Sequence, residues 1–335
     1  MRLLAVRIRA LFARPVLGGR ARACAGFAVA LAVLCAAGEA YLRVAPPANL
    51  QDYLPDSDRE GPFAPDARYG IRYRSPAALE VDCPHYGLVR KFVELPNPPP
   101  CWAMFGNSFV QMPGALADTA REKQNKFVVV NLPRVTTPVP IRFAQAEMLL
   151  ETGLRPARAF FTFIPLDAHG FELHSLSQTR ATPGGALAYE PRLPAFGGAL
   201  VRNSRLALAG YTRTGWHHAR PFAKAGALYD RVDDSVRADF RTQFAAFAET
   251  AKRHRVPVSV VLLPSYEQVT RTAGFAVQDA IAEEARAVRW GVCDVRAAFR
   301  AHPNGPALFF PDKHFSATGN DLLLREVVKH AEAQP

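Results

Sequence analysis

From Cys101 onward, short apolar runs alternate with amphipathic segments of helical length, and this alternation restricts the possible folds more than any other feature. The runs have the length of buried strands: Trp102–Phe105, Val128–Leu132, Ala159–Ile164, Val258–Leu263 and Val292–Val295. The segments between them have helical periodicity: Ile141–Glu151, Val236–His254 and Val277–Arg289. Strands that alternate with helices predict an α/β fold, a three-layer sandwich with a central parallel sheet. We expect this domain to span residues 101–333.

Two regions interrupt this pattern. Residues 44–100 are rich in proline, which predicts a stalk with a few short extended segments. Residues from about 167 to 235 are rich in Gly, Pro and polar side chains, and they read as an insertion in the domain. Within the predicted helix 236–254, Phe240, Phe244 and Phe247 recur at helical spacing, which is typical of a core-facing stripe.

The N-terminus has the pattern of a membrane anchor. Residues 1–22 hold six arginines and no acidic residue, and Ala23–Gly38 carries no charge. A transmembrane segment over 23–43 would leave the basic leader in the cytoplasm and the rest of the chain outside the cytoplasmic membrane, on the periplasmic side. A cleaved signal peptide, an organellar transit peptide and a buried core helix remain alternatives.

The charge of the chain follows the same division. The chain has 335 residues and a net charge of +11, and the six leader arginines leave +5 for the other 313 residues. A nucleic-acid binder would carry its basic excess on a folded face, so we expect no nucleic-acid partner.

Cys83 and Cys101 flank a proline-rich loop and could form a disulfide after export, with two buried thiols as the alternative. No spacing of Cys or His predicts a metal site.

Two motifs carry side chains suited to catalysis, and the first follows the first predicted strand. Phe105-Gly106-Asn107-Ser108-Phe109 would expose the hydroxyl of Ser108 at the sheet edge, where backbone N–H groups at a helix start favour an anion. The backbone N–H of Ser108 would be one of these donors. A plain turn is the simpler interpretation.

The second motif lies before the last predicted helix and reads Phe310-Pro311-Asp312-Lys313-His314-Phe315-Ser316-Ala317-Thr318-Gly319-Asn320. A histidine oriented by an aspartate can accept the proton of a serine hydroxyl. The alternative is a helix N-cap at Ser316 or Thr318 beside a surface Asp-His pair.

Together the two motifs resemble the SGNH, or GDSL-type, hydrolase family, in particular its membrane-anchored bacterial members. This resemblance implies an SGNH hydrolase-like, flavodoxin-like fold without a cofactor, in which Ser108 is the nucleophile, His314 the general base and Asp312 its orienting carboxylate. It also implies that acyl esters of envelope polysaccharide or lipid are hydrolysed or transferred through an acyl-serine. It names no protein partner.

Three positions depart from the family pattern. Asn107 stands where the family usually has Asp, and Thr136 stands near the place of an oxyanion-hole glycine, with Arg134 close to it. Leu166 replaces an asparagine whose side chain would donate to the oxyanion. The alternative function is therefore an SGNH fold without catalysis that binds or organises envelope polysaccharide. A flavodoxin-like cofactor binder is disfavoured, because no glycine-rich phosphate loop follows the first strand.

Overall fold

The computed structural model describes residues 19–45, 60–82, 100–107, 109, 128–133, 139–165, 167, 179–189, 200–201, 203–213, 229–270 and 273–334. The chain divides into two compact units. Met1–Gln51 and Leu193–Thr214 form one unit, and Asp52–Arg192 with Gly215–Pro335 form the other.

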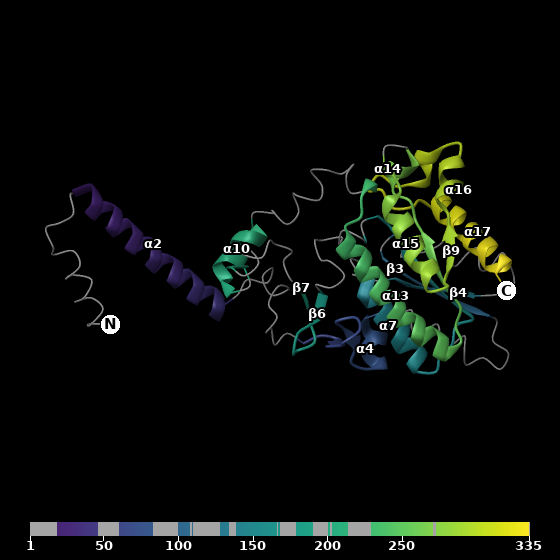
Figure 1. Cartoon of the computed structure of the whole chain (residues 1–335), viewed down its shortest axis with the longest axis horizontal. Helices are drawn as coiled ribbons and strands as arrows, with labels where there is room; N and C mark the ends of the chain where they lie inside the picture. The colour runs from purple at the N-terminus through teal and green to yellow at the C-terminus, as the bar shows by residue number, and fades with distance from the viewer. Residues whose placement is uncertain are drawn as a thin grey trace. The chain divides into compact units, whose positions relative to one another are not determined.

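The larger unit is built on a five-stranded parallel sheet, with the strand order β4-β3-β5-β8-β9 (Figure 1). Its strands are β3 (Cys101–Gly106), β4 (Val128–Pro133), β5 (Arg158–Phe163), β8 (Val258–Leu262) and β9 (Gly291–Asp294). Each strand agrees with a predicted apolar run to within one residue at either end. The run lengths were informative because strands covered on both faces have no polar side to interrupt them.

Helices cover both faces of this sheet, which confirms the three-layer α/β fold. Successive strand residues enter different cores: Ala103 and Phe105 pack into one cluster, and Trp102 and Met104 into the other. The first cluster is completed by α7 (Val139–Glu151), α13 (Asp234–His254) and α15 (Ala276–Ala287). The second is completed largely by α16 (Arg296–Ala301) and α17 (Ala317–Ala333).

The strand order places a switch point beside β3. The chain runs from β3 to β4 on one side of it and then returns to β5 on its other side. Connections that leave in opposite directions open a crevice at the carboxyl ends of these strands, where ligands bind in sheets of this type. The loops after Gly106 and Phe163 begin at this edge of the sheet.

Part of the predicted stalk belongs to this domain. Residues 60–82 form β1 (Phe63–Ala64), β2 (Arg72–Tyr73) and α4 (Pro76–Asp82). Phe63, Ile71 and Tyr73 are buried in the same cluster as the inner face of α7. The domain therefore starts before the predicted boundary at residue 101. These elements were not predicted from the sequence, because they are short, are interrupted by proline and glycine, and contain too few hydrophobic side chains for a periodic pattern.

The predicted insertion is divided between the two units. β6 (Thr179–Ala181) and β7 (Leu187–Tyr189) form an antiparallel hairpin in the larger unit. In the smaller unit, α2 (Gly19–Val44) contacts α10 (Arg205–Arg213). Ala23–Val44 is long and apolar enough to cross a membrane, so the structure supplies a candidate membrane span where the sequence predicts one.

Candidate active site

The turn after β3 is fixed by the side chain of Asn107. Asn107 is buried, and its Oδ1 accepts a hydrogen bond from the backbone N–H of Phe109 at 3.0 Å. This bond closes the chain on either side of residue 108. The amide oxygen of Asn107 thus supplies an uncharged acceptor for the turn.

The second motif forms a tight hairpin before α17. Phe309 and Phe315 make an antiparallel bridge, and the backbone N–H of Lys313 donates to the Phe310 carbonyl at 2.9 Å. Lys313 adopts a left-handed backbone conformation with φ of 68°, which turns the chain between Asp312 and His314. The two predicted catalytic side chains are therefore presented from one short loop.

Within this hairpin, Asp312 holds His314 at two points. The backbone N–H of His314 donates to Asp312 Oδ1 at 3.1 Å, and His314 Nδ1 lies 3.2 Å from Asp312 Oδ2. The first contact is the largest cause of a lowered pKa of the Asp312 carboxyl group, and the nearby imidazole adds to it. The carboxylate is 62% exposed and the imidazole 24%. Asp312 thus stays ionised in more acidic solution than an ordinary aspartate.

The residues after His314 anchor this hairpin. Ser316 is the N-cap of α17: its Oγ accepts from the Gly319 backbone N–H at 3.3 Å and donates to the Ala307 carbonyl at 2.7 Å. A Cβ on Gly319 would lie 2.2 Å from the Leu308 carbonyl oxygen, so only glycine permits this approach. The predicted N-cap is confirmed at Ser316. The cap and the Asp-His pair are both present, so the two interpretations of this motif do not exclude each other.

An aromatic contact joins the two motifs. Phe109 is buried, and its ring centroid lies 4.8 Å from that of His314 and 5.4 Å from that of Phe315. Since Phe109 directly follows Ser108, the fold brings the neighbour of the predicted nucleophile against the predicted base. Sequence reasoning did not single out Phe109. Its only signal was an apolar ring immediately after the serine.

A charged pair ties the hairpin to α14 (Tyr266–Val269). Lys313 Nζ pairs with Glu267 Oε1, and the hydroxyl of Tyr229 donates to Glu267 Oε2 at 3.2 Å. Partial burial alone would raise the pKa of Glu267, but the hydrogen bond and charge of Lys313 outweigh it and lower the pKa. The capping box of Ser265 and Gln268 fixes the start of this helix.

The turn after β5 is locked by a buried ion pair. Arg142 on α7 is fully buried, and its guanidinium contacts both carboxylate oxygens of Asp167, with Nη1 3.0 Å from Oδ2. Asp167 Oδ2 also accepts from the Ile164 backbone N–H at 2.8 Å. These contacts fix the two described ends of the turn, at Ile164 and Asp167.

Several predicted residues lie outside the described part of the chain: Ser108, Arg134, Thr136, Leu166 and Cys83. Their proposed roles stay predictions.

Cys101 is a buried free thiol, and burial raises its pKa to about 12. The bridge between Cys101 and Cys83 stays a prediction, because Cys83 lies outside the described residues. Among the described residues, no cluster of three His, Cys, Asp or Glu side chains could hold a metal ion.

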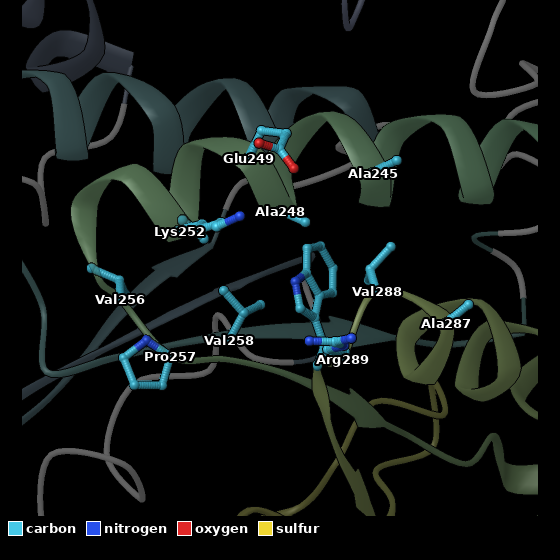
Figure 2. Close-up of a pocket in the computed structure, with 12 residues that line it drawn as sticks. Ala245, Ala248, Glu249, Lys252, Val256, Pro257, Val258, Ala287, Val288 and Arg289 are labelled. Atoms are coloured by element: carbon cyan, nitrogen blue, oxygen red, sulfur yellow. The ribbon is translucent and has the colours of Figure 1, made fainter.

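The groove shown in Figure 2 is separate from the Asp-His pair. It has a volume of about 600 Å³ and is lined by residues at the amino ends of two strands, including Pro257 before β8 and Trp290 before β9. Asn107, Phe109 and Asp167, in contrast, follow the carboxyl ends of β3 and β5. The candidate active site is therefore at the carboxyl edge, where parallel α/β sheets place their reactive groups.

No protein-family model matches the sequence, and no curated protein is significantly similar to it. Solved structures align with it at low identity. A lipase/acylhydrolase from Enterococcus faecalis is 13% identical with a TM-score of 0.40, over 70% of this chain and 96% of the other. A member of the lipolytic G-D-S-L family from Veillonella parvula is 10% identical with a TM-score of 0.39, over 68% and 96%. An α/β hydrolase from the metagenome of Lake Arreo is 11% identical with a TM-score of 0.40, over 70% and 96%.

Proposed function

We propose that this chain is a serine ester hydrolase or acyltransferase of the SGNH type, acting through an acyl-Ser108 intermediate. One observation carries the proposal: Phe109, the neighbour of Ser108, packs on His314, whose Nδ1 lies 3.2 Å from the Asp312 carboxylate. A serine and a carboxylate-oriented histidine are the side chains that acyl transfer needs, and this contact supports the pairing of the two motifs.

In the first half-reaction, Ser108 Oγ attacks the carbonyl carbon of the ester and gives its proton to Nε2 of His314. Asp312 faces Nδ1, so it fixes the tautomer that leaves Nε2 as the base and stabilises the imidazolium that forms. Collapse of the tetrahedral intermediate breaks the bond between the carbonyl carbon and the alcohol oxygen. His314 then returns the proton to the departing alcohol.

In the second half-reaction, water or another hydroxyl group adds to the acyl-Ser108 carbonyl and gives its proton to His314. Collapse of this second tetrahedral intermediate breaks the bond between the carbonyl carbon and Ser108 Oγ, His314 returns the proton to Oγ, and the free acid or the new ester leaves. The negative oxygen would be stabilised by the backbone N–H groups of Ser108 and Thr136, with Asn107 supporting the turn and Arg134 nearby. Because Leu166 supplies no side-chain donor, we expect a lower rate than in a site with three donors.

The site and the anchor together favour a substrate in the cell envelope. The candidate span Ala23–Val44 would tether the domain to the cytoplasmic membrane on its outer side, following the basic leader. Acyl esters of envelope polysaccharide or lipid are the substrates such an enzyme would meet. An SGNH fold that binds these molecules without catalysis is the second candidate, favoured by the apolar Leu166 at a donor position.

A fluorophosphonate probe tests the proposal, because it reacts with an activated serine whatever the natural acyl group. We expect the full chain in detergent to be labelled, and we expect Ser108→Ala and His314→Ala to lose labelling. His302→Ala, which removes a histidine from another loop, serves as the matched control and should label normally.

Labelling that survives in Ser108→Ala would place the reactive serine elsewhere and refute the assignment. A folded chain that reacts neither with this probe nor with a smaller sulfonyl fluoride would favour the binding function. Far-UV circular dichroism of each variant separates a lost site from a lost fold.

A further inference from the structure

The carboxylate of Glu39 lies near the C-terminal end of the candidate membrane span. A carboxylate in such a position is unfavourable unless other groups satisfy it. Here both oxygens are used. Oε1 accepts from the Arg43 guanidinium at 2.8 Å and from the Arg205 backbone N–H at 3.0 Å. Oε2 accepts from the Ser204 hydroxyl and from the Leu206 backbone N–H, each at 2.9 Å.

These partners make Glu39 a cap for another helix. Arg205 and Leu206 are the first two residues of α10, and the next N–H group, that of Ala207, donates to Ser204 Oγ at 3.1 Å. The first N–H groups of a helix carry partial positive charge, so the carboxylate is favoured there. Arg43 adds a further bond, from Nη2 to the Asn203 carbonyl at 3.1 Å. The end of the span is thus fastened to the start of α10 by several polar contacts, and Figure 1 draws the two helices side by side.

Apolar side chains surround the contact between α2 and α10. A Cβ built on Gly38 would lie 3.5 Å from Leu206 Cδ1, so Leu206 rests on the span itself one residue before Glu39. Leu206 is still 38% exposed, and Leu200 is 54% exposed. Tyr41, on the same end of α2, is exposed as well. Aromatic and aliphatic side chains at the end of a span are typical of the membrane–water interface.

The segment that contains α10 carries only positive charge. Leu193–Thr214 contains three arginines and no acidic residue. A segment that contains arginines and no acidic residue, has Leu200 and Leu206 exposed and is held at the end of a membrane span has the composition of segments that lie on an anionic bilayer.

We propose that residues 200–213 form a second membrane contact, a helix on an anionic lipid surface that Glu39 latches to the membrane-spanning helix. This inference rests on the anchoring part of the proposed function. It also requires that the N-terminal helix is retained, since removal of the helix would take the cap of α10 with it.

The test uses the full chain in lipid vesicles, with a fluorophore on Leu200→Cys. Cys24, Cys35 and Cys83 are first replaced by alanine. Cys101 and Cys293 remain, because both are buried and burial raises the pKa of each thiol to about 12, so they react slowly with maleimides. The vesicles contain brominated phosphatidylcholine, with or without phosphatidylglycerol, and iodide is the aqueous quencher.

We expect the bromolipid to quench most of the emission in vesicles that contain phosphatidylglycerol, and iodide to quench little. Glu39→Gln should reverse this pattern, while Glu151→Gln, which removes an exposed carboxylate from α7, should leave it unchanged. A label reached by iodide and not by bromolipid overturns the proposal. A label shielded from both quenchers also overturns it, since protein would then cover the segment. Equal bromolipid quenching without phosphatidylglycerol refutes the anionic preference.

Two preliminary measurements separate this inference from the proposed anchor. The intact mass of the purified chain shows whether the N-terminal helix is retained, and a carbonate wash shows whether the chain stays in the membrane. A chain that is cleaved or washed off contradicts both proposals. A retained and embedded chain with an iodide-accessible label contradicts only the second contact.

Discussion

Phe109 and His314, which come from the first and the last parts of the domain, have ring centroids 4.8 Å apart with an interplanar angle of 37°. The side chain of Asn107 accepts a hydrogen bond from the backbone N–H of Phe109, and the side chain of Asp312 accepts one from the backbone N–H of His314. The backbone that carries each ring is therefore held by a neighbouring polar side chain. The contact sets the distance between the loop of Ser108 and the imidazole that would deprotonate it.

Shortening Phe109 should slow catalysis more than it weakens the fold. Phe109→Leu keeps an apolar side chain, so we expect a loss of less than about 1.5 kcal/mol in unfolding free energy. The loss of ring contact should still slow fluorophosphonate labelling on the order of 10–10²-fold, because small displacements of a base are costly. Phe299→Leu, which removes a ring contact with Phe315 instead, is the control. Equal labelling rates for both variants would argue against this role of Phe109.

Removing the charge of Asp312 should reduce ester hydrolysis on the order of 10²–10⁴-fold at neutral pH, measured for Asp312→Asn with a chromogenic ester. The lowered pKa of Asp312 also bears on the pH profile. The Asp312 carboxylate stays charged in more acidic solution than an ordinary carboxyl group, so its protonation should not limit the activity in mildly acidic solution. A loss of activity centred at about pH 4, the usual range of a carboxyl group, in the parent chain and not in Asp312→Asn would contradict this expectation.

Gly319→Ala should destabilise the domain and disturb the hairpin. The new methyl group would lie 2.2 Å from the Leu308 carbonyl oxygen, so the segment that leads to His314 must move. We expect a loss of about 1–3 kcal/mol in urea unfolding, together with slower probe labelling. Gly210→Ala, in α10 of the smaller unit, introduces a methyl group with no atom within 4 Å and should leave the stability of this domain unchanged. A Gly319→Ala domain as stable as the parent would refute the close approach.

Breaking the Arg142–Asp167 pair should be among the most damaging single changes. Arg142→Met leaves a buried carboxylate without its guanidinium, for which we expect a loss of about 3–5 kcal/mol in urea unfolding. The double variant Arg142→Met, Asp167→Leu should recover part of that loss, because no buried charge remains. Arg231→Met, at an arginine that is 83% exposed, should change stability by less than about 0.5 kcal/mol. If the double variant is no more stable than Arg142→Met, the unpaired charge is not the cause of the loss in unfolding free energy.

His330 makes the stability of the domain dependent on pH. Its imidazole Nε2 lies 3.1 Å from the Ser259 hydroxyl, and burial, with the charge of Arg158, lowers its pKa. The unfolded chain binds the proton at about pH 6.5, whereas the folded chain binds it only in more acidic solution. Stability is therefore fully present above about pH 6.5 and falls as the pH drops. We therefore expect the unfolding free energy, measured by urea unfolding at several pH values, to decrease less on acidification in His330→Gln than in His302→Gln.

Most strands of the sheet were predictable because their side chains are buried on both faces, as in β3, β5 and β8, and are therefore mainly apolar; β9 at the edge is only partly buried. The Asp-His pair was predictable for a different reason: its residues are neighbours in the sequence. Contacts between distant residues were not. Arg142 lies in an amphipathic segment and looks like a solvated charge until Asp167 is placed beside it. The cap that Glu39 provides for α10 is equally invisible, because nothing local links residues 39 and 205.

The hairpin of Phe309 and Phe315 is the last part of the site to be synthesised. A growing chain therefore carries Ser108 before it carries His314. Under the proposed function, the nucleophile stays without its base until synthesis has passed residue 314.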